Sequence, residues 1–397
     1  MEERIAIIGA GAAGCFCAIE MKRRFPQAGV VVFEAGAKPL AKVAITGGGR
    51  CNLTNTFEGV NDLKTVYPRG ERLVRHSFSL LDPIRTQSWW EKEGVRLTAQ
   101  SDGCIFPVSQ DAMQIVRTLE NLMRRLGVEL RCNSRVTRID PGFTLTLADG
   151  STESFDRVVV TTGGGALKLL EGLDIPVEKP VPSLFTFKIQ NEGIRSLMGT
   201  IVDNTVLTLA GTKFRSEGTL LLTDWGVSGP ATLKLSSYAA RHFADNGYKG
   251  TLLVNWLATD EETLRSWISS TAAEQPKKMV SSTPPSELTA RLWKHLLGRA
   301  ALREDIRWAE MGSKGIARLV ETLLRDSYEI SDRCHFKDEF VTAGGVSTKA
   351  VSPKALESRT YHKLHFAGEV LDIDAVTGGF NLQAAWSTGY TVATECE

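Results

Sequence analysis

The sequence predicts an α/β protein in which a parallel-sheet domain is interrupted by an antiparallel β-rich segment and a helical segment. Three observations support this fold class. A glycine-rich turn joins a strand to a helix near the N-terminus, as in dinucleotide-binding βαβ units. Residues 183–255 form short alternating runs separated by turn residues. Residues 256–325 carry leucines at helical spacing.

The N-terminal unit begins with an apolar strand at residues 4–8, and residues 9–14 read Gly-Ala-Gly-Ala-Ala-Gly before a helix-forming stretch. Each glycine of this G-x-G-x-x-G pattern has its own role. Gly9 permits a tight turn, Gly11 lets the backbone approach a pyrophosphate, and Gly14 lets the helix pack closely on the strand. The helix N-terminus adds free N–H groups and the positive end of a dipole. We therefore expect a dinucleotide at this turn.

A second apolar run, residues 30–33, ends at Glu34. An acidic side chain at that place can accept hydrogen bonds from both hydroxyls of the adenosine ribose. Its negative charge would repel a 2′-phosphate, so FAD or NAD fits the motif better than NADP.

Four later segments favour FAD. They are the run 42–55, which contains three glycines and Arg50, the strand and glycine turn 158–165, the strand 363–372, which ends in glycine and acid, and the turn and helix 377–386. Strands from both ends of the chain thus surround one long ligand, which a nicotinamide cofactor alone would not require. A helix beginning near Gly379 would stabilise negative charge on a reduced flavin ring.

Pro176, Pro180 and Pro182 mark a crossing between domains. We expect a Rossmann-type FAD-binding domain at 1–182 and 336–397. A small β-barrel or antiparallel domain is expected at 183–255, with a closing strand near 326–340, and a helical subdomain at 256–325.

Composition narrows the class of protein. The 397 residues carry a net charge of +1, with 42% hydrophobic residues, so no global field attracts nucleic acid or a membrane. The seven cysteines include no C-x-x-C pair, which favours reduced thiols and predicts no metal site. No apolar run is long enough to span a bilayer and no leader pattern is evident, so we expect a cytoplasmic protein without a membrane partner.

Several motifs resemble the HI0933-like family, also described as BaiN/RdsA-like NAD(P)/FAD-dependent oxidoreductases. They are TGGGRCNLTN at 46–55, GVSGPA at 226–231, VTAGGVSTK at 341–349 and FAGEVLDIDAVTGGFNLQAAWSTGY at 366–390. The resemblance covers residues 4 to about 393. It implies an FAD domain interrupted by an inserted β-barrel and a helical subdomain.

The resemblance also implies FAD contacts, and with the glycine turns the predicted cofactor set is Gly9, Ala10, Gly11, Ala12, Ala13, Gly14, Glu34, Lys42, Thr46, Gly47, Gly48, Arg50, Asn52, Val136, Thr162, Gly163, Gly368, Glu369, Gly379, Asn381 and Leu382. Many family members continue after the 162–165 turn with a longer glycine- and tyrosine-containing segment. Here ALKLLEGLDIPVEKP follows instead, so no member's substrate transfers directly.

Candidate catalytic chemistry is sparse, with no triad, H-E-x-x-H or P-loop signature. Arg50 is the best catalytic candidate, as a fixed charge near flavin or substrate, and a structural bond to its own loop is the alternative. Further candidates, each with a structural alternative, are Cys51 and Cys104 as thiols and His362, His365, Asp372 and Asp374 as polar or proton-donating groups.

These observations predict an FAD-dependent oxidoreductase that transfers hydride between reduced flavin and a C=C or C=N bond of a small molecule, with NAD(P)H as electron donor. The resemblance also allows a flavin-dependent dihydrouridine synthase acting on ribosomal RNA. Two basic segments, 64–85 and 117–138, fit an RNA partner, although solvated helix faces would have the same composition. A non-catalytic flavin-binding protein is the third alternative.

Overall fold

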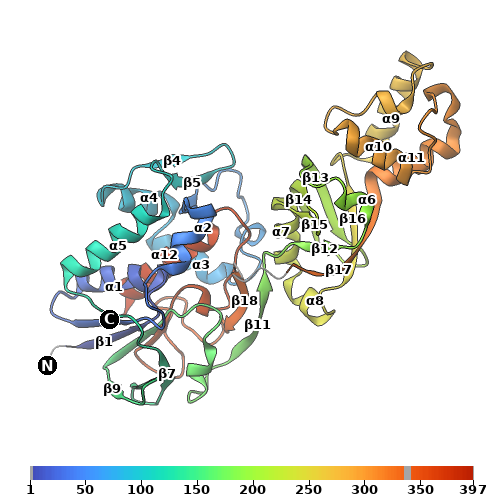
Figure 1. Ribbon diagram of the computed structural model, residues 1–397. Helices are drawn as coiled ribbons and strands as arrows, with labels where there is room; N and C mark the ends of the chain where they lie inside the picture. Colours follow the sequence, from blue (N-terminus) through green and yellow to red (C-terminus); the bar gives the residue numbers. More distant parts are fainter. Residues whose placement is uncertain (1–2, 335–340, 397) are drawn as a thin grey trace. The chain divides into compact units, whose positions relative to one another are not determined.

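The structure is a computed structural model that describes residues 3–334 and 341–396 (Figure 1). The chain divides into two compact units. Unit 1 comprises Met1–Val181 and Val341–Glu397, and unit 2 comprises Pro182–Phe340. Within the described residues, no helix combines the length and hydropathy needed to cross a membrane.

Unit 1 is built on a five-stranded sheet with the order β19-β10-β1-β2-β6, in which every neighbouring pair is parallel. The strands are β1 (Arg4–Ile8), β2 (Gly29–Phe33), β6 (Glu129–Arg131), β10 (Arg157–Val160) and β19 (Leu364–Phe366). The three central strands are almost continuous runs of Val and Ile, as expected for strands buried on both faces. The sheet therefore joins the first strand of the chain to one of its last.

Three long helices accompany this sheet: α1 (Ala12–Arg24), α5 (Ala112–Leu126) and α12 (Phe380–Glu395). In Figure 1, α1 and α5 lie on one side of the sheet and the small sheet β7-β8-β9 lies on the other. Helices α1 and α12 approach closely at Gly389, which has no side chain. A Cβ atom there would lie 2.6 Å from the Ala13 carbonyl oxygen. The C-terminal helix is thus packed directly on the first helix.

The remaining elements of unit 1 are short. The helices are α2 (Ala41–Gly49), α3 (Glu71–Leu80), α4 (Pro83–Lys92) and the 3-10 turns Leu63–Thr65, Leu167–Leu170 and Gly368–Val370. The strands form the sheets β3-β5-β4, β7-β8-β9 and β11-β18, with bounds β3 (Thr54–Asn55), β4 (Leu97–Ala99), β5 (Cys104–Pro107), β7 (Val136–Ile139), β8 (Thr144–Leu147), β9 (Thr152–Ser154), β11 (Val177–Ser183) and β18 (Val341–Val346).

Unit 2 contains a closed barrel with the order β12-β15-β14-β13-β16-β17. Its strands are β12 (Phe187–Ile189), β13 (Ile201–Leu209), β14 (Arg215–Leu222), β15 (Gly226–Ser228), β16 (Gly250–Asn255) and β17 (Asp326–Arg333). Strand β17 pairs with both β12 and β16 and so closes the barrel. Residues 335–340 of the closing strand expected near 326–340 lie outside the described residues.

The helices of unit 2 are α6 (Glu192–Arg195), α7 (Pro230–Tyr238), α8 (Ala240–Asp245), α9 (Glu261–Glu274), α10 (Ala290–Arg299) and α11 (Gly312–Arg325), with 3-10 turns at Val280–Ser282 and Trp308–Glu310. The leucines at helical spacing lie on α10 and α11, where Leu292, Leu296, Leu319 and Leu323 are fully buried. They join the barrel side chains in one hydrophobic core.

Candidate functional site

Four predicted cofactor segments follow four neighbouring parallel strands. Residues 9–14 follow β1, Glu34 follows β2, Thr162 and Gly163 follow β10, and Gly368 and Glu369 follow β19. Because the strands are parallel, all four segments lie at one edge of the sheet. The order of the sheet places β2 and β10 on opposite sides of β1, which is the switch point where α/β proteins bind ligands.

The glycine turn after β1 has the geometry that its spacing indicates. A Cβ atom at Gly9 would lie 2.6 Å from the Thr161 carbonyl oxygen, and one at Gly14 would collide with the Gly9 carbonyl oxygen. At Gly11, in contrast, no atom lies within 4 Å of the Cβ position. The first turn of α1 carries no acidic residue and no capping side chain. This helix end therefore offers open space and backbone donors to an anion.

The Glu34 carboxylate is oriented by backbone N–H groups. Its Oε2 accepts from Ala10 N at 3.0 Å and its Oε1 accepts from Gly36 N at 2.7 Å. Each carboxylate oxygen can accept a further hydrogen bond, so these contacts fix the group without exhausting it. The Ser134 amide donates to the Glu34 carbonyl at 2.8 Å, which brings the chain leading to Val136 alongside the end of β2.

On the other side of β1, the Glu369 carboxylate lies among three segments. Its Oε1 accepts from Thr342 N at 2.7 Å, and its Oε2 is 3.8 Å from Lys42 Nζ. A Cβ atom at Gly163 would lie 3.8 Å from the same Oε2. Gly368 packs on α1, since its Cβ position is 2.8 Å from the Ala13 Cβ. Predicted residues from both ends of the chain thus meet here.

Helix α2 carries the next predicted residues and is interrupted at Thr46, which has extended backbone angles. Gly47, Gly48 and Gly49 then adopt positive φ values of 58°, 68° and 84°. No atom lies within 4 Å of the Cβ positions of Gly48 and Gly49. The interruption turns the chain and leaves an uncrowded backbone surface. The Leu40 amide, just before α2, donates to Ala10 O at 2.7 Å, so this loop is attached to the first glycine turn.

Asn52 connects that loop to the C-terminal helix. Its Nδ2 donates to Thr54 O at 3.0 Å and its Oδ1 accepts from Gly379 N at 3.2 Å. Asn55 Nδ2 donates to Gly378 O at 3.0 Å, and Trp386 Nε1 donates to Leu53 O at 3.0 Å. The segments 46–55 and 378–386 are therefore adjacent. Helix α12 begins at Phe380 without a capping side chain or an acidic residue in its first turn.

The loop that leads into α12 is held by two residues that sequence reasoning did not select. Arg69, 12% exposed, makes a bidentate ion pair with the fully buried Asp374. The Tyr67 hydroxyl donates to Phe380 O at 2.8 Å. The amide of Asn381 exchanges hydrogen bonds with the backbone of Ala375. In the sequence, Arg69 stands inside a basic segment, and nothing near it indicates that it pairs with Asp374, more than 300 residues away.

The candidate thiols are buried. Burial raises the pKa of Cys51 to about 12 and that of Cys104 to about 11. Since the thiolate is the reactive form, neither cysteine has the environment of a redox-active thiol.

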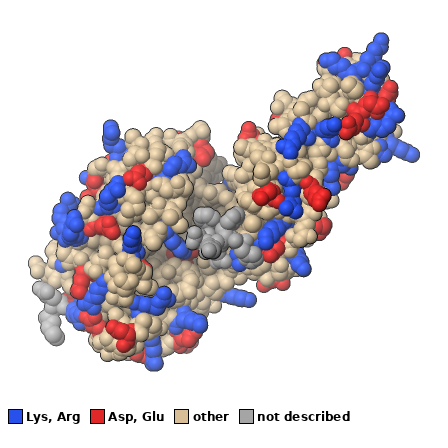
Figure 2. Space-filling view, viewed as in Figure 1, with Lys and Arg blue, Asp and Glu red and all other residues tan. Residues whose placement is uncertain are grey.

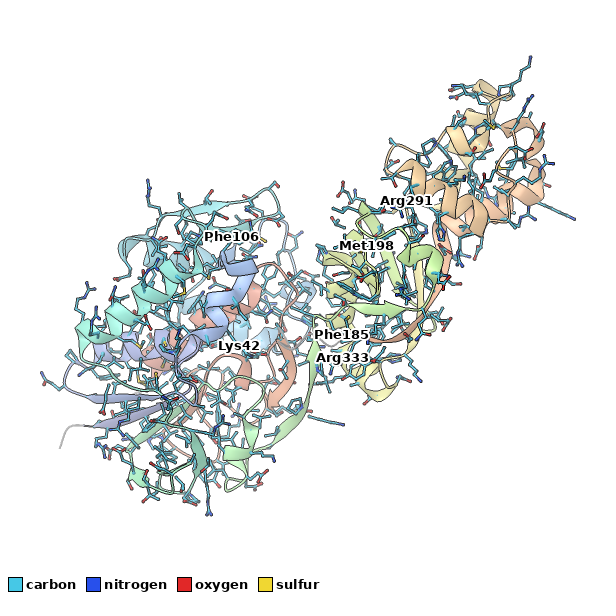
Figure 3. All side chains as sticks on the ribbon, viewed as in Figure 1. Lys42, Phe106, Phe185, Met198, Arg291 and Arg333 are labelled. Carbon is cyan, nitrogen blue, oxygen red and sulfur yellow. The ribbon has the colours of Figure 1, made fainter. Side chains whose placement is uncertain are left out.

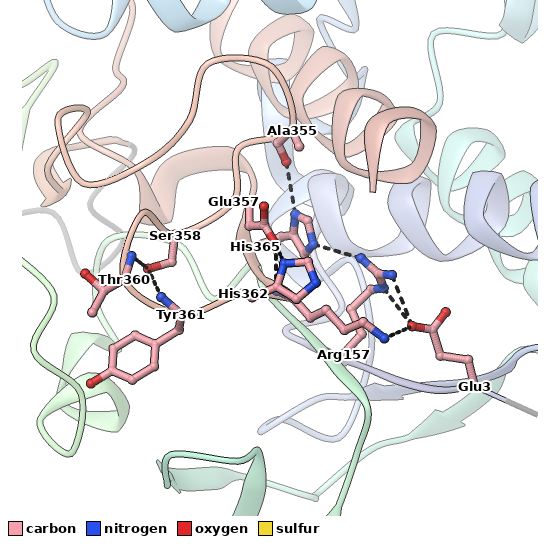
Figure 4. A network of polar contacts seen from close by, with 10 residues as sticks. Glu3, Arg157, Ala355, Glu357, Ser358, Thr360, Tyr361, His362 and His365 are labelled. Atoms are coloured by element: carbon pink, nitrogen blue, oxygen red, sulfur yellow. Dashed lines mark hydrogen bonds and ion pairs between the residues drawn. The ribbon is translucent and has the colours of Figure 1, made fainter. Parts of the chain in front are cut away.

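His365 is also buried, at 1% exposure, and belongs to a polar network shown in Figure 4. Arg157 Nη1 lies 3.0 Å from His365 Nε2, and because arginine only donates, Nδ1 carries the proton and donates to Ala355 O. Glu3 pairs with Arg157 at the far side of the network. Desolvation lowers the pKa of His365 to about 4. An enclosed imidazole that is neutral near neutral pH fits a structural role.

Each of the two basic segments is paired with acidic residues in part. In the first, Arg69, Arg75 and Arg85 have carboxylate partners. In the second, the paired residues are Arg117, Arg125, Arg131 and Arg138. Figure 2 shows blue and red atoms interspersed over the face in view. Phosphate groups would have to compete with these acidic partners.

Unit 2 contains a cavity of about 560 Å³, lined by Val206, Thr208, Arg215, Leu253, Asn255, Ala258, Thr259, Asp260, Leu324 and Arg325. All the predicted cofactor residues belong to unit 1. None of the predicted cofactor residues lines this cavity.

A family model and three relatives match this chain over nearly its whole length. A family model described as HI0933-like protein Rossmann domain matches residues 3–395. A 3-dehydro-bile acid delta(4,6)-reductase of Clostridium scindens is 29% identical, over 98% of this chain and 97% of the relative. Ribosomal RNA dihydrouridine synthases of Haemophilus influenzae and Escherichia coli are 27% and 28% identical, each over 98% of this chain and 96% of the relative.

Proposed function

We propose that this chain, which belongs to the HI0933-like family and is a flavin-dependent oxidoreductase, binds FAD at the carboxyl edge of its parallel sheet. In this proposal it transfers hydride to a C=C or C=N bond, with NAD(P)H as electron donor. The observation that supports the proposal is the set of contacts that joins residues 9–14, at the edge of the sheet, to residues 40–55 and 368–382.

The residues present fit a dinucleotide. Gly11 leaves open the space above the α1 N-terminus that a pyrophosphate needs, while Gly9 and Gly14 are required for the close packing that builds the turn. Glu34 is held in place to accept from ribose hydroxyls. No acidic side chain occupies the first turn of α1, where it would repel phosphate.

The other half of the site fits a flavin ring. Gly48 and Gly49 present uncrowded backbone, which lets a flat ring lie close to the chain. The uncapped N-terminus of α12 provides a positive dipole end that favours added negative charge. When bound and reduced, FAD supplies the hydride. In this proposal the loop of Gly48 and Gly49 and the N-terminus of α12 orient the ring. The buried thiols of Cys51 and Cys104 take no part in the reaction.

The relatives support a C=C bond as the acceptor. A delta(4,6)-reductase adds hydrogen across steroid double bonds, and a dihydrouridine synthase adds hydrogen across the C5=C6 bond of uridine. Both double bonds are conjugated to a carbonyl group in the substrates that these names describe.

The test is to purify the protein and record its absorption spectrum, then add NADH or NADPH without oxygen. We expect the absorption bands of oxidised flavin, bleaching by at least one nicotinamide, and recovery of the bands on adding a conjugated enone. A protein without flavin would defeat the proposal. Bleaching without recovery on any acceptor would instead indicate a non-catalytic flavin-binding protein.

A second candidate is reduction of a uridine in ribosomal RNA, which is favoured by two relatives that align over nearly the whole chain. The pairing of the basic segments with acids gives it no additional support. It is tested by nucleoside analysis of ribosomal RNA from a strain that lacks the gene. An unchanged dihydrouridine content would remove this candidate.

A further inference from the structure

Arg50 is an immobilised cation at the edge of the proposed flavin site. Its Nε donates to Gly47 O at 3.1 Å, and its guanidinium lies 4.5 Å above the centre of the Phe106 ring. A stacked guanidinium is attracted by the negative face of the ring, and this attraction favours the observed orientation of the long side chain. Lys42, in the first turn of α2, and Phe106 are labelled in Figure 3.

The support beneath Arg50 is rigid. Phe106 is 3% exposed and lies on β5, whose four residues are all buried. Strand β5 pairs with β3, and Leu53 N donates to Ile105 O at 2.8 Å, so the strand is attached to the chain just after Arg50. The Phe106 ring also touches the glycine loop, since its Cε1 would lie 3.2 Å from a Cβ atom at Gly47. The ring therefore fixes both the loop and the guanidinium.

The Arg50 guanidinium still has hydrogen-bond donors that these contacts do not engage. Among the described parts of the chain, Arg50 has the Gly47 bond and the ring contact and no ion pair. Both terminal nitrogens remain available, and the side chain is exposed. An arginine that is held in place without a carboxylate partner is prepared for an oxygen atom of a ligand, because its planar fork of N–H donors matches such oxygens.

We propose that Arg50 binds the carbonyl oxygen conjugated to the double bond that the enzyme reduces, and that Phe106 is the residue that positions it. The substrate class is then a planar conjugated carbonyl compound. This inference rests on the proposed function and narrows it.

The chemistry requires such a group. Addition of hydride, one hydrogen with two electrons, to the β-carbon breaks the C=C π bond and moves its electron pair toward the carbonyl oxygen. A proton from solvent then adds to the α-carbon, and the C=O bond is restored. The substrate gains two hydrogens, and NAD(P)H, which becomes NAD(P)⁺, supplies the two electrons. A fixed guanidinium stabilises the negative charge that develops on the oxygen, at no cost in reorganisation.

The experiment compares Arg50→Gln, Arg50→Lys and Phe106→Leu with the wild type, all as flavin-loaded protein. Arg359→Gln is the matched control, because Arg359 Nε also donates to a backbone carbonyl at 3.1 Å, that of Lys349. Benzoate, a flat conjugated carboxylate, is the probe, and neutral benzamide is its counterpart. Binding is measured by titration calorimetry, and flavin content is measured by absorbance.

We expect Arg50→Gln to weaken benzoate binding roughly tenfold or more, as for loss of a charge-assisted hydrogen bond. Arg50→Lys should restore part of the affinity, and Phe106→Leu should lose less than Arg50→Gln. Benzamide, whose oxygen is a neutral conjugated carbonyl, should bind more weakly than benzoate and should also lose affinity in Arg50→Gln, and Arg359→Gln should match the wild type. Reoxidation of the reduced flavin by a conjugated enone should slow roughly tenfold or more in Arg50→Gln and stay at the wild-type rate in Arg359→Gln.

Equal benzoate binding by the wild type and Arg50→Gln would overturn the inference, as would a wild type that binds no benzoate. Loss of flavin from Arg50→Gln would overturn it too, because Arg50 would then serve the cofactor. If Phe106→Leu fails to fold, the exposed Arg50 variants decide the matter. Protein purified without flavin would defeat the proposed function itself, a failure seen before any benzoate is added.

Discussion

Two glycines of the first turn have different structural roles, and substitution by alanine can distinguish them. Gly14 is a packing glycine and Gly11 is an open one, although both belong to the same six-residue motif. An alanine methyl at Gly14 would collide with the Gly9 carbonyl oxygen, whereas one at Gly11 would enter empty space.

We therefore expect Gly14→Ala to lower the free energy of unfolding by about 1–3 kcal/mol, as overpacking does. Gly11→Ala should leave unfolding of the flavin-free protein unchanged and raise the FAD dissociation constant roughly tenfold or more, about 1.4 kcal/mol. Urea titration and calorimetry measure the two quantities. Equal effects of both variants on stability would contradict this separation.

His365 gives a prediction for pH dependence. Its pKa is lowered to about 4 by burial, so between pH 6.5 and 4 the unfolded chain binds a proton that the folded chain does not. Stability therefore falls as pH falls through this window, by about 3 kcal/mol in total. His365→Gln should flatten that slope in urea titrations. His362→Gln, at a side chain that is 75% exposed, is the control, and an equal flattening there would refute the assignment.

At the scale of elements, residues 67–70 contact the loop 372–379 and the start of α12 and hold them in place. Gly70 is required there, because a Cβ atom at that position would lie 2.8 Å from Asp372 O. The buried Arg69–Asp374 pair and the Tyr67 hydroxyl complete these contacts. The N-terminus of α12 is thus held by a segment that contributes nothing to the sheet.

Arg69→Leu should cost about 3–5 kcal/mol of unfolding free energy, because the buried Asp374 carboxylate would lose its ion pair with Arg69. Adding Asp374→Asn should recover part of that loss, since the charge is then removed. Urea titration measures both, and FAD retention on gel filtration should follow the same order. A double variant no more stable than Arg69→Leu would show that the ion pair is not what holds the loop.

At the scale of the whole molecule, the insertion that forms unit 2 leaves and re-enters unit 1 through neighbouring strands. Strands β11 and β18 are paired, and a Cβ atom at Gly344 would lie 2.5 Å from Lys179 O. The two ends are therefore close enough for a short flexible link.

Replacing residues 182–340 with a short Gly-Ser linker should give a folded unit 1 that keeps FAD, because every predicted cofactor residue belongs to that unit. Near-native flavin content and cooperative unfolding are the expected results, measured by absorbance and thermal melting. Complete loss of flavin from a folded unit 1 would place part of the cofactor site in unit 2.

The sequence by itself determined the local features of this protein. The glycine spacing at 9–14, the acidic residue after the second strand and the helical periodicity near 292 and 319 depend on residues close together in the chain, and they indicated the α/β class. The motifs at 46–55, 226–231, 341–349 and 366–390, which are also local, carried the resemblance to the family. Only the tertiary structure decided which distant groups meet: the pairing of Arg69 with Asp374, the contact of Asn52 with Gly379, and the stacking of Arg50 on Phe106. Such contacts leave no periodic signal, because they depend on how separately formed elements pack against one another.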